Sequence, residues 1–244
     1  MSDIRFIGKI EIYLTLKKII DIYQITERSV SLFSFYRGNM ISKKESIINA
    51  ATLLFTRKGF IQTRASDISD MTGVAEGTIF YHFKSKEGLF LYILKKFKED
   101  IIQEYDQYKK NNIDQSGLDM LESSISFYLN LASGMEDRFL LLHRHDAYEL
   151  AKINGACKEV LVVIYECFFD IFETAILEGQ KDGSIIELPP RKTAMIIFSM
   201  ADGVARFDTY DLYDAGSLYS ELIQSCRRML KKQKDPEVEF SDDL

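Results

Sequence analysis

The fold of this chain is decided by residues 63–83, which read TRASDISDMTGVAEGTIFYHF. Apolar residues recur three to four positions apart on both sides of Gly73, so each half of the stretch predicts a short helix with one apolar side. Glycine accepts the left-handed backbone conformation that commonly ends a helix. Two short helices joined at such a turn form the layout of a helix-turn-helix, whose second helix enters the major groove of DNA.

The second of these helices leaves polar and aromatic side chains on its outward side. They are Glu76, Gly77, Thr78, Phe80, Tyr81 and His82. Aromatic rings that point away from a core favour a binding surface, and a recognition helix contacts base edges with its N-terminal residues. The stretch therefore predicts a DNA reader.

The flanking segments add a helix on each side. Ser42 is placed to cap a helix over residues 43–58, where Lys and Gly follow the last apolar position. Ser85 is placed to cap a longer helix over about residues 86–109, with apolar residues on one side. The predicted order is therefore helix, helix-turn-helix and long helix.

Several motifs follow one another without gaps through this segment. They are Ala50-Ala51-x-x-Leu54-Phe55-x-x-x-Gly59-Phe60, Thr63, Asp67-Ile68, Gly73-Val74, Gly77-Thr78-Ile79-Phe80-Tyr81-His82-Phe83 and Ser85-Lys86-Glu87-x-Leu89. On these motifs, residues 44–98 resemble the DNA-binding domain of the tetracycline-repressor (TetR/AcrR) family.

The resemblance implies a set of DNA contacts. In the family, the threonine and aromatic residues of the recognition helix contact bases and phosphates, while the histidine and the lysine after the serine contact phosphates. Residues that open the preceding helix anchor the DNA backbone. By position, and with the first two residues of the recognition helix included, the predicted DNA-binding residues are Thr63, Arg64, Ser66, Glu76, Gly77, Thr78, Phe80, Tyr81, His82 and Lys86.

The recognition helix departs from the family pattern in three places. Ala75 stands where a capping serine is usual, and the loss of a capping oxygen costs about 1 kcal/mol. Glu76 stands where relatives often carry a basic residue; it either complements the helix dipole or accepts a hydrogen bond from a cytosine amino group. Phe80 replaces a commoner tyrosine, which removes a hydroxyl group and keeps a ring for a thymine methyl group.

Charge is distributed unevenly along the chain. Residues 42–98 hold 10 Lys and Arg against 5 Asp and Glu, whereas residues 99–244 hold 15 against 28. The sequence pI of 5.3 is acidic, but attraction to phosphate is local and depends on salt. A basic segment on an acidic protein fits a DNA-binding domain, and the acidic remainder discourages DNA from binding elsewhere.

The whole chain is predicted to be all-α. It contains only three prolines, and its β-branched residues fall into helical patterns. Gly, Asn and Pro residues that typically end or begin helices predict further helices over about residues 115–133, 136–152, 156–181, 189–210 and 215–232. The helix over residues 156–181 is the most apolar segment, yet Glu159, Glu166, Asp170 and Glu173 share one stripe of it, which favours a wet side on a bundle helix over a membrane span.

The resemblance also implies the roles of the domains. In the family the last two helices pair with their copies in a second subunit, and the middle helices enclose an effector pocket. The predicted organisation is an N-terminal extension over residues 1–39, a three-helix DNA-binding domain over 40–98 with its helix-turn-helix at 64–83, an effector-binding and dimerisation domain over 99–234 that the long helix joins to it, and an acidic disordered tail over 235–244.

Aromatic side chains suited to a ligand pocket are plentiful in the effector-binding domain, although at helical spacing most such residues belong to a core. The set favours a mainly apolar or aromatic small molecule. The predicted effector-binding residues are Tyr105, Phe127, Tyr128, Phe139, His143, Tyr165, Phe169, Phe198, Asp202 and Arg206.

Two polar groups in this domain leave alternatives open. Asp202 and Arg206 lie one turn apart, and we interpret them as an ordinary surface pair, with capture of a ligand carboxylate or phosphate by Arg206 as the alternative. His143 and His145 suggest a metal site, but side chains two apart on a helix point in different directions, which favours packing or surface histidines. No metal or cofactor is therefore predicted.

The three cysteines, Cys157, Cys167 and Cys226, lack paired spacing. Reduced packing thiols in a cytoplasmic protein are the preferred interpretation, with a redox sensor as the alternative. The first 39 residues lack the features of a secretory signal. Met40 is predicted to be the natural start and the preceding residues a translated leader, with an additional helix over residues 10–25 as the alternative.

Together these patterns predict a cytoplasmic, homodimeric repressor that binds a palindromic operator in double-stranded DNA and is released by an effector. The alternatives are an activator of the same family and a constitutive DNA-organising protein without an effector. An enzyme is disfavoured, because the sequence shows no Ser/His/Asp set, no glycine-rich phosphate loop and no metal-ligand spacing.

Overall fold

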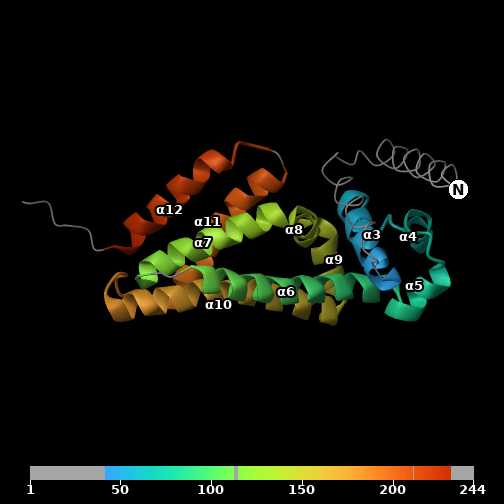
Figure 1. Cartoon of the computed structure of the whole chain (residues 1–244), viewed down its shortest axis with the longest axis horizontal. Coiled ribbons are helices and arrows are strands. Elements are labelled where there is room, and N and C mark those ends of the chain that lie inside the picture. Colours follow the sequence, from blue (N-terminus) through green and yellow to red (C-terminus); the bar gives the residue numbers. More distant parts are fainter. Residues whose placement is uncertain (1–41, 113–114, 211, 232–244) are drawn as a thin grey trace, which may run out of the picture. The chain divides into compact units, whose positions relative to one another are not determined.

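The computed structural model of the chain describes residues 42–112, 115–210 and 212–231. Every regular element within these ranges is an α-helix, so the prediction of an all-α fold is confirmed (Figure 1). The helices are α3 (Lys43–Arg57), α4 (Ala65–Thr72), α5 (Glu76–Phe83), α6 (Lys86–Asn111), α7 (Gly117–Gly134), α8 (Glu136–His143), α9 (His145–Ile153), α10 (Gly155–Asp182), α11 (Pro190–Thr209) and α12 (Gly216–Leu230). The predicted leader over residues 1–39 and the predicted tail over 235–244 lie outside the described residues.

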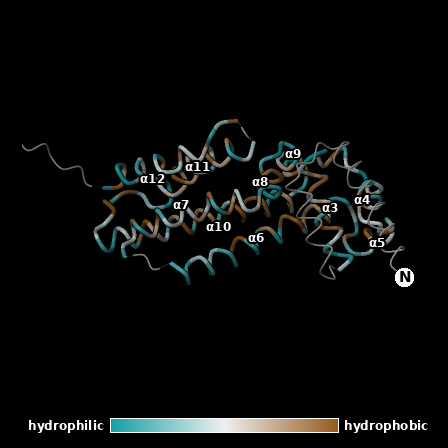
Figure 2. Tube along the Cα trace, turned by 45° about the horizontal axis from the view of Figure 1, so that its top comes forward, coloured by the Kyte–Doolittle hydropathy of each residue, from teal (hydrophilic) through white to brown (hydrophobic). Residues whose placement is uncertain are grey.

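The chain divides into two compact units, with the boundary between Ile93 and Leu94. This boundary falls inside α6, which Figure 1 shows as one continuous helix. In both units, hydrophobic and hydrophilic residues alternate along each helix instead of gathering in separate stretches (Figure 2). This alternation is the pattern of helices that bury one side and expose the other.

Local capping signals define the helices of the first unit as the sequence predicts. The Ser42 hydroxyl accepts a hydrogen bond of 3.1 Å from the Glu45 N–H, which fixes the start of α3. Gly73 ends α4 at φ 70°, in the left-handed conformation. Both predictions are confirmed.

Three aromatic rings form the centre of the first unit. Phe55 of α3 lies 5.4 Å from Phe60 and 5.8 Å from Phe90 of α6, measured between ring centroids. The Phe60 and Phe90 rings meet edge to face with their centroids 5.1 Å apart, and these ring contacts favour one arrangement of the helices. Ile79 and Phe83 of α5 are buried as well, so the recognition helix is held by one apolar side.

The turn between α5 and α6 is unusually tight. Lys84 has φ 67° and ψ −43°, and the Ser85 N–H donates to the Phe83 carbonyl at 2.8 Å across it. This is a γ-turn, which is rare and strained for a residue with a side chain. Gly88 packs on the same carbonyl, because a Cβ atom at position 88 would lie 2.1 Å from the Phe83 oxygen.

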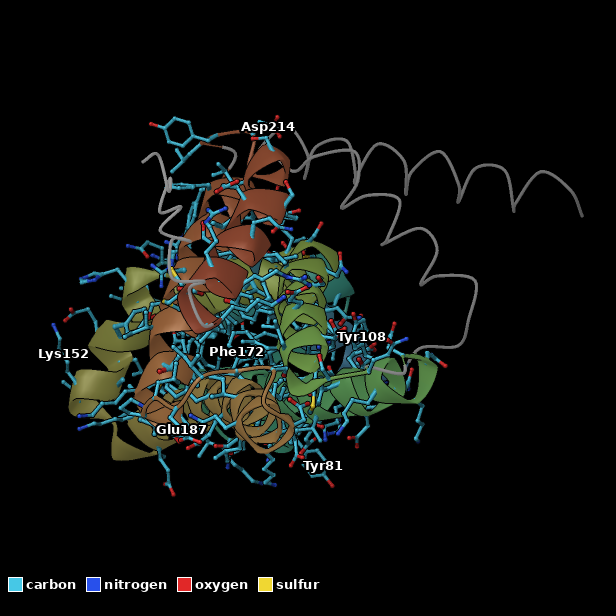
Figure 3. The ribbon with its side chains drawn as sticks, turned by 90° about the vertical axis from the view of Figure 1, so that its left-hand side faces the viewer. Tyr81, Tyr108, Lys152, Phe172, Glu187 and Asp214 are labelled. Carbon is cyan, nitrogen blue, oxygen red and sulfur yellow. The ribbon has the colours of Figure 1, made fainter. Side chains whose placement is uncertain are left out.

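In the second unit, α7, α10 and α11 pack against one another. Figure 3 shows the Phe172 side chain in the interior of this bundle, whereas Lys152 and Asp214 lie at its edge. The end of α10 closes the start of α7, since the Gly117 N–H donates to Asp182 Oδ2 at 2.7 Å. The two backbones approach closely there, and a Cβ atom on Gly117 would lie 1.9 Å from the Gly179 nitrogen.

The prediction of one helix over residues 136–152 is wrong. Arg144 is extended at φ −68° and ψ 141°, and it separates α8 from α9. The break changes the directions of the flanking residues, so that the His143 side chain is buried whereas His145 is exposed. Burial of His143 against a partner on α11 stabilises the interruption, which no glycine or proline marks in the sequence.

Acidic residues of α10 form the wet stripe that the sequence predicts. One guanidinium group, that of Arg191 on α11, pairs with Glu166, with Asp170 at 2.7 Å and with Glu173 at 2.9 Å. The acids are therefore partly neutralised by the neighbouring helix. Within the described ranges, no helix combines the length and the apolar character needed to cross a membrane.

Candidate DNA-binding surface and buried polar cluster

Helix α5 exposes the residues that the sequence predicts on its outward side. The Tyr81 and Phe80 side chains are exposed to 75% and 40%, and His82 is exposed as well. The Tyr81 and His82 rings meet edge to face, with their centroids 5.4 Å apart. These rings thus form an aromatic surface on a helix whose other side is anchored in the core.

The N-terminal end of α5 is open to an acceptor. Ala75 provides no side-chain cap, and the N–H groups of Glu76 and Gly77 have no hydrogen-bond partner among the described residues. Both residues are exposed, and nothing lies within 4 Å of a Cβ atom built on Gly77. Unpaired N–H groups at a helix start are suited to phosphate oxygens.

The start of α4 is fixed by Asp67. Its carboxylate accepts from the Arg64 N–H at 2.7 Å and pairs with Lys58 Nζ at 2.6 Å. Burial acts to raise the pKa of Asp67, but these hydrogen bonds and the charge of Lys58 outweigh it, and the pKa is lowered. Arg64 is exposed and Ser66 is half-buried, so both lie at an accessible helix start.

Two of the residues predicted to contact DNA make hydrogen bonds inside the first unit instead. Thr63 is fully buried, and its hydroxyl donates to the Gly59 carbonyl at 2.7 Å. The Lys86 ammonium donates to the carbonyls of Phe60 at 2.8 Å and Thr63 at 3.0 Å. In this arrangement Thr63 and Lys86 hold the loop before α4. Thr78 is half-buried, which leaves part of its side chain accessible.

A buried carboxylate organises the second unit. Asp202 Oδ1 accepts from the Tyr128 hydroxyl at 2.6 Å and lies 2.9 Å from His143 Nε2, and its Oδ2 accepts from Arg206 Nε at 2.9 Å. The Asp202 residue is only 9% exposed. The interpretation of Asp202 and Arg206 as an ordinary surface pair is therefore wrong. Their pairing is part of a cluster that spans α7, α8 and α11.

The cluster keeps Asp202 ionised. Burial acts to raise its pKa, but the hydrogen bonds from His143 and Tyr128 and the charge of Arg206 prevail and lower it. Burial, followed by the neighbouring Asp202 charge, raises the pKa of Tyr128 well above its ordinary value, so this phenol stays a donor. A carboxylate with three donors is a fixed anchor inside an apolar bundle.

A second polar pair lies near the cluster. The hydroxyl oxygens of Tyr148 on α9 and Tyr165 on α10 are 2.5 Å apart. Burial, together with the hydrogen bond to Tyr148, raises the pKa of Tyr165. Arg206 interacts electrostatically with both phenols. The polar groups of α9, α10 and α11 are thus brought to one region.

Aromatic rings surround these polar groups. Phe198 of α11 lies with its ring centroid 5.1 Å from that of Tyr128 and 5.2 Å from that of Phe169. Phe139 of α8 contacts Tyr128 at 5.6 Å and lies 6.0 Å from the His143 ring. The rings therefore provide an apolar surrounding on several sides of the polar cluster.

Eight of the ten predicted effector residues thus belong to one neighbourhood. The other two, Tyr105 and Phe127, form a separate pair with ring centroids 5.1 Å apart. The sequence prediction also omitted Tyr148, whose place beside Tyr165 depends on the packing of α9 on α10. The contact between Tyr148 and Tyr165 cannot be predicted from sequence spacing, because the two residues lie on separate helices, α9 and α10.

Two contacts join α6 to the helix that carries His143. The Phe97 ring of α6 meets the Phe139 ring edge to face at 5.3 Å. The Arg138 guanidinium of α8 pairs with the Asp100 carboxylate of α6. Helices α6 and α8 are therefore linked by one apolar contact and one ion pair.

Comparison with known proteins identifies the first unit. Residues 47–93 match the family model described as bacterial regulatory proteins, tetR family. These residues thus form a domain of this family. It is 26% identical over 189 residues to the fatty acid metabolism regulator protein of Bacillus subtilis (strain 168), an alignment that covers 75% of this chain and 94% of the relative.

Further relatives agree with this assignment. The chain is 23% identical over 154 residues to the transcriptional repressor KstR2 of Rhodococcus jostii (strain RHA1), an alignment that covers 58% of the chain and 67% of that protein. The crystal structure of the regulator FadR from Bacillus subtilis with stearoyl-CoA shares the fold, with a TM-score of 0.61, 24% identity and coverage of 74% and 96%. These relatives are transcriptional regulators, and the chain shares the helical fold of the solved one.

Proposed function

We propose that this regulator is a repressor that binds a pseudo-palindromic operator as a homodimer. The exposed side of α5 carries the proposal, since two aromatic rings, a histidine and an uncapped helix start form one accessible surface. Glu76, Gly77, Thr78, Phe80 and Tyr81 are proposed to contact base edges and nearby phosphates. Arg64, Ser66 and His82 are proposed to bind phosphates, while Thr63 and Lys86 support the loop before α4.

Exposed apolar residues support the dimer. On α11, Met195, Ile196 and Phe207 are exposed to 43%, 56% and 36%, and Ile196 and Phe207 lie about three helical turns apart on one side. On α12, Leu218 and Met229 are exposed to 38% and 42%. An apolar surface on the last two helices is suited to a second copy of the chain. Two recognition helices in successive major grooves must then lie about 34–36 Å apart.

An effector with a mainly apolar body is proposed to control this spacing. The ring cluster around Phe198 and the names of relatives, among them a fatty acid metabolism regulator and a regulator in complex with stearoyl-CoA, support an apolar ligand. Helix α6 runs from one unit into the other and contacts α8 through Phe97 and Asp100. A ligand shifts the population off DNA only through its differential affinity for the two states.

Nuclease footprinting on the promoter region of the gene tests the DNA-binding proposal. We expect one protected site with dyad symmetry, and a loss of affinity of at least ~10-fold for Tyr81→Ala, since a recognition-helix contact is worth ~1–3 kcal/mol. Lys152→Ala is the control, because this lysine is exposed on α9. Protection that fails to localise would favour a DNA-organising protein, and a reporter that gains expression with the protein would identify an activator.

A further inference from the structure

The polar cluster of the second unit leaves hydrogen-bond donors unused. We infer that Arg206, Tyr148 and Tyr165 form a head-group site for an apolar ligand that ends in a carboxylate. This inference rests on the proposed effector response and specifies the chemical class of the effector. The remaining ring cluster is the neighbourhood for the apolar body of the same ligand.

Arg206 is held in an orientation that leaves one edge available. Its Nε donates to Asp202 Oδ2 at 2.9 Å, and Asp202 is itself fixed by Tyr128 and His143. The two terminal Nη groups of Arg206 make no hydrogen bond to any residue within the described ranges. Two parallel N–H donors on a planar guanidinium match the two oxygens of a carboxylate.

The tyrosine pair supplies a further donor. Two hydroxyl groups 2.5 Å apart share one hydrogen bond, so one of the two phenolic hydrogens is left over. Neither Tyr148 nor Tyr165 has another hydrogen-bond partner within the part of the chain that the structure describes. The Tyr165 ring packs on Phe198 of α11 with the centroids 5.9 Å apart, and Phe198 and Arg206 lie two turns apart on the same side of that helix. The electrostatic interaction of Arg206 with both phenols agrees with this placement. We therefore expect the spare O–H and the spare Nη groups to serve one acceptor.

The head group is therefore expected to carry acceptors and no donor. An ammonium group would place a positive charge beside Arg206, and an alcohol offers one weak acceptor to three donors. The Arg206 side chain is 41% exposed, so water screens the repulsion between an entering carboxylate and the Asp202 carboxylate.

The surroundings of Tyr165 suit an apolar body. Its ring stacks on Phe169 at an interplanar angle of 24° and meets the Phe198 ring edge to face at 5.9 Å. Phe198 in turn stacks on Phe168 with the centroids 5.6 Å apart. A ligand anchored at Arg206 would thus lie along aromatic rings. The Phe198 ring also lies 6.3 Å from that of Phe172, whose side chain Figure 3 shows in the interior of the bundle.

Three probes with one ten-carbon body separate the possible head groups. Decanoate, methyl decanoate and decylamine are titrated into the full-length protein, and thermal unfolding reports binding, because a ligand that prefers the folded state raises Tm. We expect decanoate to bind at least ~10-fold more tightly than the ester, the effect of one charge-assisted pair, and decylamine to leave Tm unchanged. Equal or tighter binding of the ester would overturn the inference, as would binding of decanoyl-coenzyme A without binding of the free acid.

Variants assign the preference to the site. Arg206→Gln is expected to abolish the preference for decanoate over the ester, and Arg206→Lys to keep only part of it, since an ammonium group lacks the two-pronged edge. Tyr148→Phe is expected to weaken decanoate alone. Arg228→Gln, which removes an exposed arginine paired with Glu221, is the matched control and retains the wild-type preference. An unchanged preference in Arg206→Gln with an intact circular-dichroism spectrum would overturn the assignment.

Operator binding without any probe is measured on the same preparations. A wild-type protein that fails to bind the operator would count against the proposed function. The preference for a carboxylate head group would still be measured, because the Tm shifts do not depend on DNA. Retained operator binding together with indifference to the head group would overturn only the carboxylate site.

Discussion

Removal of the Asp202 carboxylate is expected to destabilise the second unit strongly. In Asp202→Ala, the Tyr128 hydroxyl and the His143 ring nitrogen lose their acceptor while both stay buried. A buried donor without a partner costs about 1–3 kcal/mol, and Arg206 adds less because solvent reaches its side chain. We therefore expect the free energy of unfolding to fall by about 3–5 kcal/mol, as for a broken buried ion pair.

Urea denaturation followed by far-ultraviolet circular dichroism measures this loss. Asp106→Ala is the control, because Asp106 is an exposed aspartate on α6, and a surface substitution costs about 0.5 kcal/mol or less. In a double-mutant cycle, Tyr128→Phe should cost at least ~1 kcal/mol less in the Asp202→Ala background than in the wild type, because the donor it removes has already lost its acceptor. A loss no larger than that of the control, or strictly additive effects, would refute the role of the cluster as a buried anchor.

Three further outcomes follow from the same geometry. Because the pKa of Asp202 in the folded protein lies below its ordinary value of 3.8, its contribution to stability is full above about pH 5 and declines as the pH falls through 3.8 and below. Asp202→Asn should therefore make the free energy of unfolding depend less on pH in this range. A variant with the same pH dependence as the wild type would contradict the lowered pKa of Asp202. Gly88→Ala should lower Tm and weaken operator binding, because a Cβ atom would meet the Phe83 carbonyl at 2.1 Å and such overpacking costs about 1–3 kcal/mol; Gly134→Ala, with open space around the added atom, should leave both unchanged. Cys226 should resist a thiol reagent in the folded protein at pH 8, because burial raises its pKa to about 11; rapid labelling, or loss of DNA binding after mild peroxide, would restore the redox-sensor hypothesis.

Most of the first unit could be predicted from the sequence because its determinants are local. Ser42, Gly73 and Ser85 act within a few residues of themselves, as a cap, a left-handed stop and a cap. The outward face of α5 follows from the buried positions of Ile79 and Phe83. Local chemistry of this kind is visible in the sequence.

The buried cluster could not be predicted in the same way. Tyr128 and His143 lie 74 and 59 positions from Asp202, and only the Arg206 contact has helical spacing. The local pair of Asp202 and Arg206 therefore suggested a surface interaction, whereas tertiary packing buries Asp202 and brings two further donors to it. The inward direction of Thr63 and the engagement of Lys86 with backbone carbonyls also depend on how the loop before α4 folds back.

The closure of α7 by the end of α10 has a consequence for how the protein is made. The N–H groups of Gly117 and Leu118 find their acceptors in Asp182 and Ser184, 65 and 66 positions later in the chain. The first unit is complete at residue 93 and can fold while synthesis continues, since domains fold as units from the N-terminus. The start of α7 acquires its native partners only after the turn beyond α10 has left the ribosome, so the second unit completes its fold later than the first.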